Sequence, residues 1–305
     1  MQVSVIIVNY NTKKLTSECI DSVFEKTKDV EFEVILVDNA STDGSVEHFS
    51  NDKRIKFIAS PENLGFGRAN NKGLEVATGK YIFYLNSDTL LANNAIKLFY
   101  DKMEASPEEI ACMGTLLWDK EGKVTHSFGR FPTVRAALLY ATPIYWLPRH
   151  LGFKSRIYDD PKYVKGHFFQ VPYVTGADMF VRRSVIDKYG AFDPDFFMYY
   201  EDPDMQLRHF KHGYVSYIYD APHIHHLRGA SSKKSPTMKA RMISLRSIYT
   251  YHKKHASKFA YAMLRILFPL FSSIHLLHPK RSWSDKAGYL KATIFMRVEI
   301  VAYGG

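Results

Sequence analysis

The sequence predicts an α/β fold, in which a mostly parallel sheet is flanked by helices and followed by a C-terminal helical extension. Four runs of apolar, β-branched or aromatic residues stand near the start of the chain, at residues 3–8, 33–37, 54–59 and 80–85. Unbroken runs of this kind are typical of strands buried on both faces of a parallel sheet. Helical patterns separate them, as βαβ units require. A chain of 305 residues, 46% of them hydrophobic, suits one large domain with an appendage, or two domains.

The first helix is predicted by the stretch TKKLTSECIDSVFEK, which lies between the first two strands. Asn11 or Thr12 is available as its N-cap. The stretch DNASTDGSVEHF supplies turn and cap residues before a short helix, and GFGRANNKGLEVATG predicts a helix from about Gly67 to Gly79. Residues 114–173 are less periodic and are predicted to form loops around a cleft. The apolar residues on one face of the first helix are Leu15, Cys19, Ile20, Val23 and Phe24.

Two later helices are predicted to begin at acidic residues. Asp88 is available as the N-cap of the helix TLLANNAIKLFYDKM, as an alternative or an addition to a metal-binding role. In the stretch YYEDPDMQLR, Asp202 fits an N-cap and Pro203 fits the first helical position. Asp204 is spaced i,i+4 from Arg208, as an ion pair on a helix would be. Local rules therefore explain each of these acids without a functional role, and leave Glu201 unexplained.

The positive charge of the chain is concentrated at its C-terminal end. Residues 233–305 hold 14 Lys and Arg against two acids, a balance of +12, so the rest of the chain carries −2 of the total of +10. A basic end on a near-neutral body suggests an anionic partner, either lipid headgroups or nucleic acid; the alternative is a solvated basic face. The stretch FAYAMLRILFPLFSSIHLL favours a basic-flanked interfacial helix over a spanning one, with a helix packed on the domain as the alternative.

Cysteine usage and the N-terminus predict a cytoplasmic protein. Cys19 and Cys112 are the two cysteines of the chain, too few for a disulfide framework. The start MQVSVIIVNYN has no basic n-region, and its apolar run is short for a signal peptide. We expect a cytoplasmic location, with a peripheral position on the inner face of the membrane if the C-terminal extension binds lipid.

Polar residues follow the predicted strands at the sheet edge where α/β proteins collect their ligands. An aspartate such as Asp38 can accept hydrogen bonds from a base or ribose, or can form a turn with a helix cap at Ser41 or Asp43. Asp88 can hold a hard divalent cation on a diphosphate, or cap a helix, or both. The residues that follow the strands are Asn9 and Asn11, then Asp38 and Asn39, then Asn86, Ser87 and Asp88.

Histidines and a second acidic group complete the candidate residues. The stretch HIHHLRGASS offers imidazoles for a metal or a phosphate, and spacing alone does not select one of them. The loop GAFDPDFFMYY is rich in aromatic residues and delivers Glu201 and Asp202 beside what resembles a sugar-binding wall. The sequence contains no P-loop and no GxGxxG after the first strand, which disfavours a dinucleotide oxidoreductase.

In their order, these segments resemble the family-2 inverting glycosyltransferases of GT-A (Rossmann-like) fold, in particular the bacterial rhamnosyltransferase-like branch. The resemblance is carried by VSVIIVNYN, VDNASTDGS with NLGFGRANN, LNSD, VTGADMFVRR with GAFDPDFFMYYEDPDMQLR, and HHLRGASS, and it spans residues 3–232. It implies a catalytic domain at residues 1–232 and a basic, apolar-rich helical extension at residues 233–305.

The resemblance also implies a role for each matching residue. Asp202 would be the general base, with Glu201 near the acceptor. Asp88, in the position of an Asp-x-Asp motif, and His226 would hold Mg²⁺ or Mn²⁺, with His225 as the alternative histidine. Asn86 departs from the acidic first position of that motif and implies a weaker metal site. The residues implied in binding the donor and lining its sugar pocket are Asn9, Asn11, Asp38, Asn39, Arg68, Asn70, Asn86, Ser87, Gly176, Ala177 and Asp178.

The implied reaction is direct displacement of a nucleoside diphosphate by an acceptor hydroxyl, with inversion at the sugar. The donor would be a dTDP- or UDP-linked sugar, with rhamnose favoured. The acceptor would be a saccharide, in one version linked to polyprenyl diphosphate. Nucleic acid is not expected as a partner, because the strand ends are acidic. Rival classes are a basic nucleic-acid-binding protein, a non-catalytic sugar-nucleotide-binding module and a nucleotidyltransferase.

Overall fold

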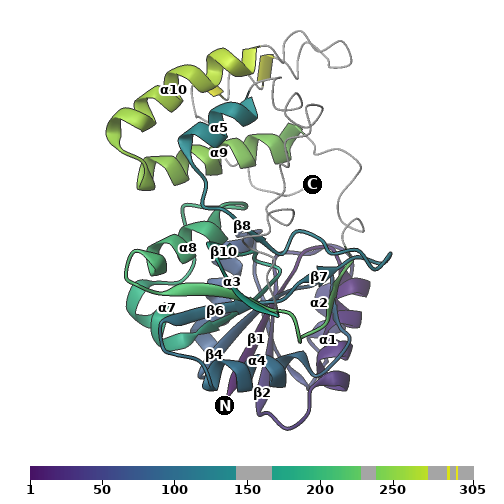
Figure 1. Ribbon diagram of the computed structural model, residues 1–305. Coiled ribbons are helices and arrows are strands. Elements are labelled where there is room, and N and C mark those ends of the chain that lie inside the picture. Colours follow the sequence, from purple (N-terminus) through teal and green to yellow (C-terminus); the bar gives the residue numbers. More distant parts are fainter. Residues whose placement is uncertain (142–166, 228–237, 274–286, 289–292, 295–305) are drawn as a thin grey trace.

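A computed structural model describes residues 1–141, 167–227, 238–273, 287–288 and 293–294 (Figure 1). A large twisted sheet with helices on both faces forms the lower part of the molecule in this view, and three helices lie together above it. The first strand begins at the bottom of the sheet, close to the N-terminus, so the carboxyl ends of the parallel strands point toward the upper helices.

The central sheet has eight strands in the order β3-β2-β1-β4-β11-β6-β12-β9. The first four are parallel neighbours, as predicted, and each lies within one residue of its predicted bounds. β11 runs antiparallel to both of its neighbours, and β9 runs antiparallel at the edge. The strands are β1 (Val3–Asn9), β2 (Phe32–Asp38), β3 (Ile55–Ala59), β4 (Tyr81–Asn86), β6 (Ile110–Gly114), β9 (Phe168–Val171), β11 (Asp178–Arg182) and β12 (Val215–Tyr219).

Alternate residues of β1 divide the core into two layers. Val3, Val5 and Ile7 face a cluster that contains side chains of α1 (Lys13–Lys26) and α4 (Ala95–Glu104). Ile6 faces a second cluster, which contains side chains of the helices on the other face. Burial on both faces explains why these strands read as unbroken apolar runs. The helices that contribute to the second cluster are α3 (Phe66–Val76), α7 (Arg183–Tyr189) and α8 (Glu201–Phe210).

Two small sheets lie beside the central one, and one of them corrects the predicted role of Asp88. Thr89–Leu91 forms β5 rather than the first turn of a helix, because it pairs antiparallel with β13 (Ile224–His226). Helix α4 starts later, after Asn94, so Asp88 caps no helix. β13 also pairs with β7 (Leu117–Trp118), and β8 (Phe128–Gly129) pairs with β10 (Tyr173–Val174).

Two helix boundaries differ from the predicted ones: the start of α8 and the end of α3. α8 begins at Glu201, and its N-cap position is Tyr200, so Asp202 lies inside the first turn and is not the cap. α3 ends at Val76 rather than near Gly79. Gly79 approaches β1 so closely that an added Cβ would lie 2.5 Å from the Ser4 nitrogen, so this position has no room for a side chain. The short helix α2 (Ser45–Phe49) forms as predicted.

The upper region includes three of the described helices. They are α5 (Val134–Ala141), α9 (Met238–His255) and α10 (Lys258–Ser272). Their shared core contains Ala137, Leu245, Tyr249, Leu264 and Phe268. None of the described helices is both long and apolar enough to cross a membrane. The predicted domain boundary between residues 232 and 233 lies outside the described residues.

We expect Gly65→Ala to lower the free energy of unfolding by about 2 kcal/mol or more. Gly65 has φ +82°, and an added Cβ would lie 2.1 Å from the Phe197 carbonyl oxygen, which accepts a hydrogen bond from the Phe66 amide. Gly213 is the matched control, because its φ is +89° but an added Cβ would meet nothing. Urea titrations that give the same loss for Gly65→Ala and Gly213→Ala would contradict this account.

Candidate active site

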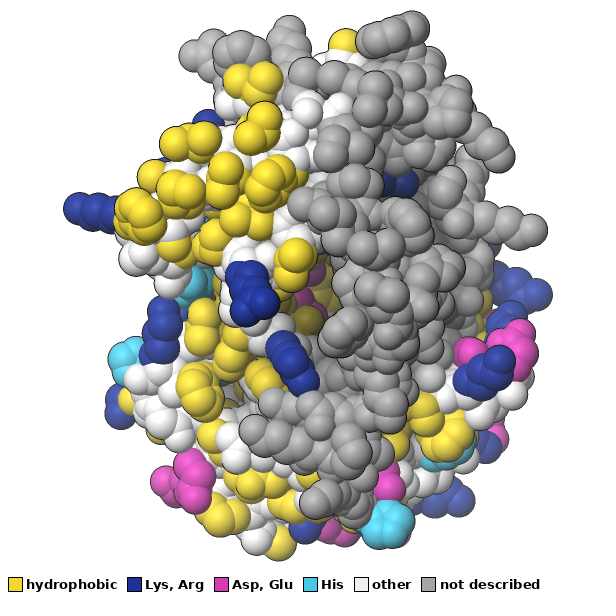
Figure 2. Space-filling view, turned by 45° about the horizontal axis from the view of Figure 1, so that its top comes forward, with side chains coloured by type: hydrophobic (Ala, Val, Ile, Leu, Met, Phe, Trp, Pro, Cys, Tyr) yellow, Lys and Arg dark blue, Asp and Glu magenta, His cyan; other side chains and the backbone are white. Residues whose placement is uncertain are grey.

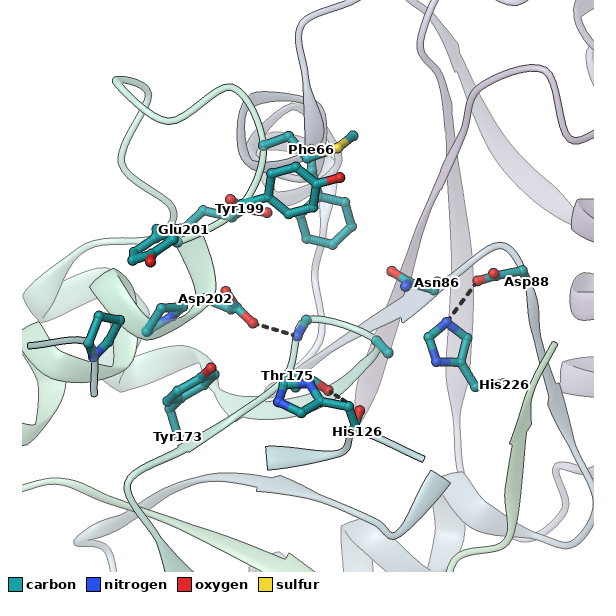
Figure 3. Close-up of a pocket in the computed structure, with 16 residues that line it drawn as sticks. Phe66, Asn86, Asp88, His126, Tyr173, Thr175, Tyr199, Glu201, Asp202 and His226 are labelled. Carbon is teal, nitrogen blue, oxygen red and sulfur yellow. Dashed lines mark hydrogen bonds and ion pairs between the residues drawn. The ribbon is translucent and has the colours of Figure 1, made fainter. Parts of the chain in front are cut away.

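A pocket of about 710 Å³ opens at the carboxyl-end edge of the sheet (Figure 3). The end of β4 delivers Asn86 to it, the turn between β4 and β5 delivers Asp88, and the turn before β11 delivers Gly176 and Ala177. Figure 3 shows Asp202 on one side and the pair Asp88 and His226 on the other. The lining consists of Phe66, Asn86, Asp88, His126, Pro132, Tyr173, Thr175, Gly176, Ala177, Met198, Tyr199, Tyr200, Glu201, Asp202, Pro203 and His226.

Asp88 and His226 meet across two elements that are far apart in the sequence. Nε2 of His226 lies 3.2 Å from Oδ1 of Asp88, because β13 pairs with the strand that follows Asp88. Successive strand residues point to opposite faces. His225 accordingly turns away from the pocket lining, and its ring meets His223 at 4.9 Å. Of the two candidate histidines, the structure brings His226 to Asp88.

The Asp88 and His226 pair fits a divalent cation only in part. A carboxylate oxygen and an imidazole nitrogen are both donors that Mn²⁺ accepts, and phosphate oxygens commonly complete such a site. The second ring nitrogen of His226 is buried and has no partner among the described residues. The part of the chain that the structure describes contains no group of three or more His, Cys, Asp or Glu side chains arranged for a metal. A cation here would therefore depend on ligands from a bound diphosphate.

Asp202 is held against the turn that precedes β11. Its Oδ2 accepts a hydrogen bond from the Gly176 amide at 3.1 Å. Gly176 fits between Asp202 and Phe66, whose ring atoms would lie 3.2 Å from an added Cβ. The backbone amide of Asn86 in turn donates a hydrogen bond to the backbone carbonyl of Ala177 at 3.0 Å. These bonds join the two sides of the pocket through the backbone of one short turn.

Glu201 and Asp202 are adjacent carboxyls with raised pKa values. Burial raises the pKa of Asp202, and the amide of Gly176 opposes this shift only in part. Burial raises the pKa of Glu201, and the charge of Asp202 raises it further. One carboxylate oxygen of Glu201 is buried with no hydrogen-bond partner among the described residues. Burial therefore has a larger effect on the pKa of Asp202 than the backbone amides that bond to its carboxylate.

The turn that leads into α8 has an unusual backbone. Tyr199 and Tyr200 both have φ near +70°, a conformation that costs bulky residues free energy. Helix α9 contacts this turn twice. The Ser247 hydroxyl donates to the Met198 carbonyl at 2.7 Å, and the ring of Tyr251 lies 5.5 Å from that of Tyr200. The helical extension thus forms part of the support of the pocket wall.

Asp204 ties the first turn of α8 to the same extension. It is fully buried, and its Oδ2 forms an ion pair with Nε of Arg208 at 3.0 Å, as the i,i+4 spacing predicts. Its other oxygen lies 2.7 Å from Nε2 of His255, at the end of α9. Two residues later, Gln206 donates a hydrogen bond to the backbone carbonyl of Val174 and accepts one from its backbone amide. These contacts hold α8 to both α9 and β10.

Most predicted donor residues at β1 and β2 lie outside the pocket. Asn9 and Asp38 are fully buried and are joined at 2.6 Å, and the Ser41 amide donates to Asp38 at 2.9 Å. The side-chain oxygen of Asn11 accepts a hydrogen bond from the backbone amide of Thr42, and that of Asn39 accepts one from the backbone amide of Leu64. These side chains hold the loops after the two strands together. Their contact with a nucleobase stays a prediction.

Four more predicted residues also lie outside the lining. The hydroxyl of Ser87 lies 3.2 Å from that of Thr12, Arg68 donates to the Pro194 carbonyl, and Asn70 donates to the Phe66 carbonyl. The predicted position of Asp178 in the lining of the sugar pocket is corrected by the structure. Asp178 starts β11, is fully buried, and accepts the Thr115 amide instead of lining the pocket. Burial raises the pKa of its carboxyl.

Several lining residues were not identified from the sequence. Phe66 and Tyr199 are two of these residues, and both contribute aromatic rings to the lining of the pocket. The aromatic run before Glu201 signalled Tyr199 and Tyr200 as a platform, but not as single residues. His126 and Tyr173 come from the aperiodic segment that was predicted to surround a cleft. No spacing rule singles out these two residues, since long-range pairing of β8 with β10 positions them.

Comparison with known proteins gives one family. A family model described as Glycosyl transferase family 2 matches residues 4–190. The chain is 26% identical over 212 residues to the N-acetylglucosaminyl-diphospho-decaprenol L-rhamnosyltransferase of Mycobacterium tuberculosis, a match that covers 63% of this chain and 66% of that protein. It is 31% identical over 112 residues to the glycosyltransferase GlyG of Streptococcus pneumoniae, covering 35% of this chain and 37% of that relative's length.

Solved structures show the same fold. The mannosyltransferase PcManGT of Pyrobaculum calidifontis, in complex with GDP-Man and Mn²⁺, superposes with a TM-score of 0.55 at 17% identity, covering 94% of this chain and 77% of that one. S. aureus TarS in complex with UDP-GlcNAc gives a TM-score of 0.55 at 15% identity, covering 96% and 82%. The predicted GT-A fold class is confirmed.

We expect Glu201→Gln to make the protein more stable than the wild type at pH 8, by about 1 to 3 kcal/mol. A carboxyl whose folded pKa is raised destabilises the fold above its unfolded pKa. The advantage of the variant should therefore grow as pH rises from about 4 to 8. Urea titrations across this range measure it.

Glu33→Gln is the control, because this substitution is expected to change stability with pH in the opposite direction. Burial raises the pKa of Glu33, but hydrogen bonds from Lys56, Ser4 and Thr78 outweigh this and lower it to about 2. A carboxyl with a lowered folded pKa stabilises the fold above its unfolded pKa, and this contribution is lost as pH falls through the folded pKa. Glu33→Gln should thus be less stable than the wild type at pH 8 and approach it at low pH. Parallel pH trends in the two variants would contradict the account of Glu201.

Proposed function

The chain belongs to glycosyltransferase family 2, and on this premise we propose that it transfers a sugar, with inversion, from a nucleotide-diphosphate sugar to a saccharide acceptor. One observation carries the proposal. Asp202 and the pair Asp88 and His226 face the same pocket from opposite sides (Figure 3). This leaves room between them for the bond that breaks and the hydroxyl that attacks.

Asp202 is the proposed general base. Its raised pKa brings its basicity nearer to neutral pH, where proton transfer from a hydroxyl is most effective. The hydrogen bond from Gly176 fixes one carboxylate oxygen and leaves the other for the acceptor hydroxyl. Burial and the charge of Asp202 raise the pKa of Glu201, which favours the protonated form of Glu201 beside the base. The aromatic rings of Phe66 and Tyr199 supply apolar faces against which a sugar can pack.

Asp88 and His226 are the proposed holders of the donor diphosphate end. Mg²⁺ or Mn²⁺ at this pair would neutralise the charge of the departing nucleoside diphosphate. Buried Asn9, Asp38 and Asn39, together with exposed Asn11, are proposed to shape the nucleotide end of the site.

The donor and acceptor are proposed from the relatives. The name of the relative from Mycobacterium tuberculosis supports rhamnose as the sugar and a polyprenyl-diphosphate-linked saccharide as the acceptor. We propose dTDP as the carrier of this sugar. The UDP-GlcNAc bound to TarS supports a UDP-sugar as the alternative donor. The proposed setting is bacterial surface polysaccharide synthesis at the inner face of the cytoplasmic membrane, with residues 1–232 as the catalytic domain. Thermal-shift screening of nucleotide sugars with Mn²⁺, followed by mass spectrometry of the product, identifies the pair.

We expect Asp202→Asn to lower kcat by about 100-fold or more, since a positioned base contributes that much. Donor affinity, measured by calorimetry, should stay within about twofold, because Asn can still accept the Gly176 hydrogen bond. In the wild type, kcat should fall as pH drops through the raised pKa of Asp202, because the base form is then lost. Asp187→Asn, an exposed acid on α7, is the control. Turnover of Asp202→Asn close to that of the wild type would end the assignment.

His226→Ala should weaken the Mn²⁺-dependent binding of UDP and dTDP by about 10-fold or more. Asp88→Ala should do the same, since the two side chains form one pair. The matched control is His225→Ala, which alters the neighbouring histidine on the opposite face of β13. Calorimetry with and without Mn²⁺ separates the metal-dependent part of the affinity. Equal losses for His225→Ala and His226→Ala would contradict the assignment.

A further inference from the structure

Helix α10 exposes an apolar stripe. Phe259, Ile266 and Leu270 are 77%, 66% and 61% exposed, and Ala262 between them is exposed too. Spacings of three and four residues place all four on one face of the helix. Leu139, on the adjoining helix α5, is 49% exposed. The described surface thus carries an aligned set of large apolar side chains, which isolated surface residues would not form.

The opposite face of α10 is already buried. Leu264 and Phe268 pack with Tyr249 of α9 and Ala137 of α5. The helix is therefore apolar on both sides, although its inner side alone would hold it to the protein. A helix with this pattern is expected where both sides are covered. The outer stripe calls for a second apolar environment.

The positive charge near the stripe favours an anionic lipid surface as that environment. Helices α5, α9 and α10 carry eight Lys and Arg residues and no Asp or Glu. Lys253 and Lys258, at the junction of α9 and α10, are exposed near the start of the stripe. Basic residues beside an apolar helical face are the pattern that binds anionic lipid. A second copy of this chain docked through the same face would instead bring two basic surfaces together.

The stripe lies on the same side of the molecule as a hollow. Figure 2 shows hydrophobic side chains gathered over the upper helices, Lys and Arg side chains at their border, and a hollow with acidic side chains beside them. Helix α9 connects this region to the candidate pocket, because Ser247 bonds to the carbonyl of Met198, which lines the pocket. A surface that covers the stripe would lie close to the substrate site.

We infer that α10 docks on an anionic lipid bilayer. Phe259, Ile266 and Leu270 insert at the boundary of the acyl chains, and Lys253 and Lys258 contact the headgroups. Docking in this way would place the pocket beside lipid-linked acceptors. The inference does not depend on the proposed reaction, because lipid binding is measured without donor or acceptor.

Flotation of the full-length protein with phosphatidylcholine vesicles, with and without 30 to 40% phosphatidylglycerol, tests the inference. We expect binding to the anionic vesicles, weakening as salt rises. The triple variant Phe259→Ser, Ile266→Ser and Leu270→Ser should bind about 100-fold or more weakly, on the apolar area removed. Lys253→Gln with Lys258→Gln should weaken binding to anionic vesicles alone and reduce its dependence on salt.

Val76→Ser with Val124→Ser is the matched control, since both residues are exposed apolar side chains outside the three helices. It should bind vesicles as the wild type does. Circular dichroism and nucleotide-sugar affinity show whether each variant is folded. No vesicle binding by the wild type, or equal binding by the folded triple variant, overturns the inference. A wild-type dimer that becomes monomeric in the triple variant, without vesicle binding, also overturns it in favour of a second copy.

Discussion

The position of β11 is the constraint on which the pocket depends. This strand runs antiparallel between β4 and β6, so its first residues lie at the edge where β4 ends. The bond from the Asn86 amide to the Ala177 carbonyl closes that edge, and the Gly176 amide then points at Asp202. If β11 ran parallel to β4, its last residues rather than its first would lie beside the end of β4. One reversal of strand direction therefore joins an acid from α8 to residues that follow β4.

The helical extension is structurally continuous with this arrangement. His255 bonds to the buried Asp204, and Lys254 lies within 2.8 Å of carboxylate oxygens of both Asp193 and Asp195 in the loop before α8. Removing α9 would expose Asp204 and release the turn at Tyr199 and Tyr200. These ionic contacts cross the proposed boundary between the catalytic domain and the helical extension. Loss of activity on truncation would not by itself indicate loss of a membrane anchor.

Sequence patterns predicted the elements whose structure is decided locally. The first four strands, the first helix and the Asp204 and Arg208 pair follow from periodicity and spacing. Elements decided by distant partners were missed: Thr89–Leu91 becomes a strand because it pairs with Ile224–His226, about 130 residues later. For the same reason, spacing left the two histidines equivalent, while strand alternation in β13 separates them. The order of motifs supplied the family, but burial determined which predicted residues reach the pocket.

Burial also reverses the expected chemistry of the acids in α8. A carboxylate in the first turn of a helix is normally stabilised by the helix dipole, which lowers its basicity. Here three acids crowd that turn, and burial of Glu201 and Asp202 favours their protonated forms instead. The same burial that makes Asp202 a stronger base makes this turn costly to fold. The turn persists because β10 holds it through Gln206 and α9 holds it through His255, so the basicity of the site and the contacts of the extension are two consequences of one packing arrangement.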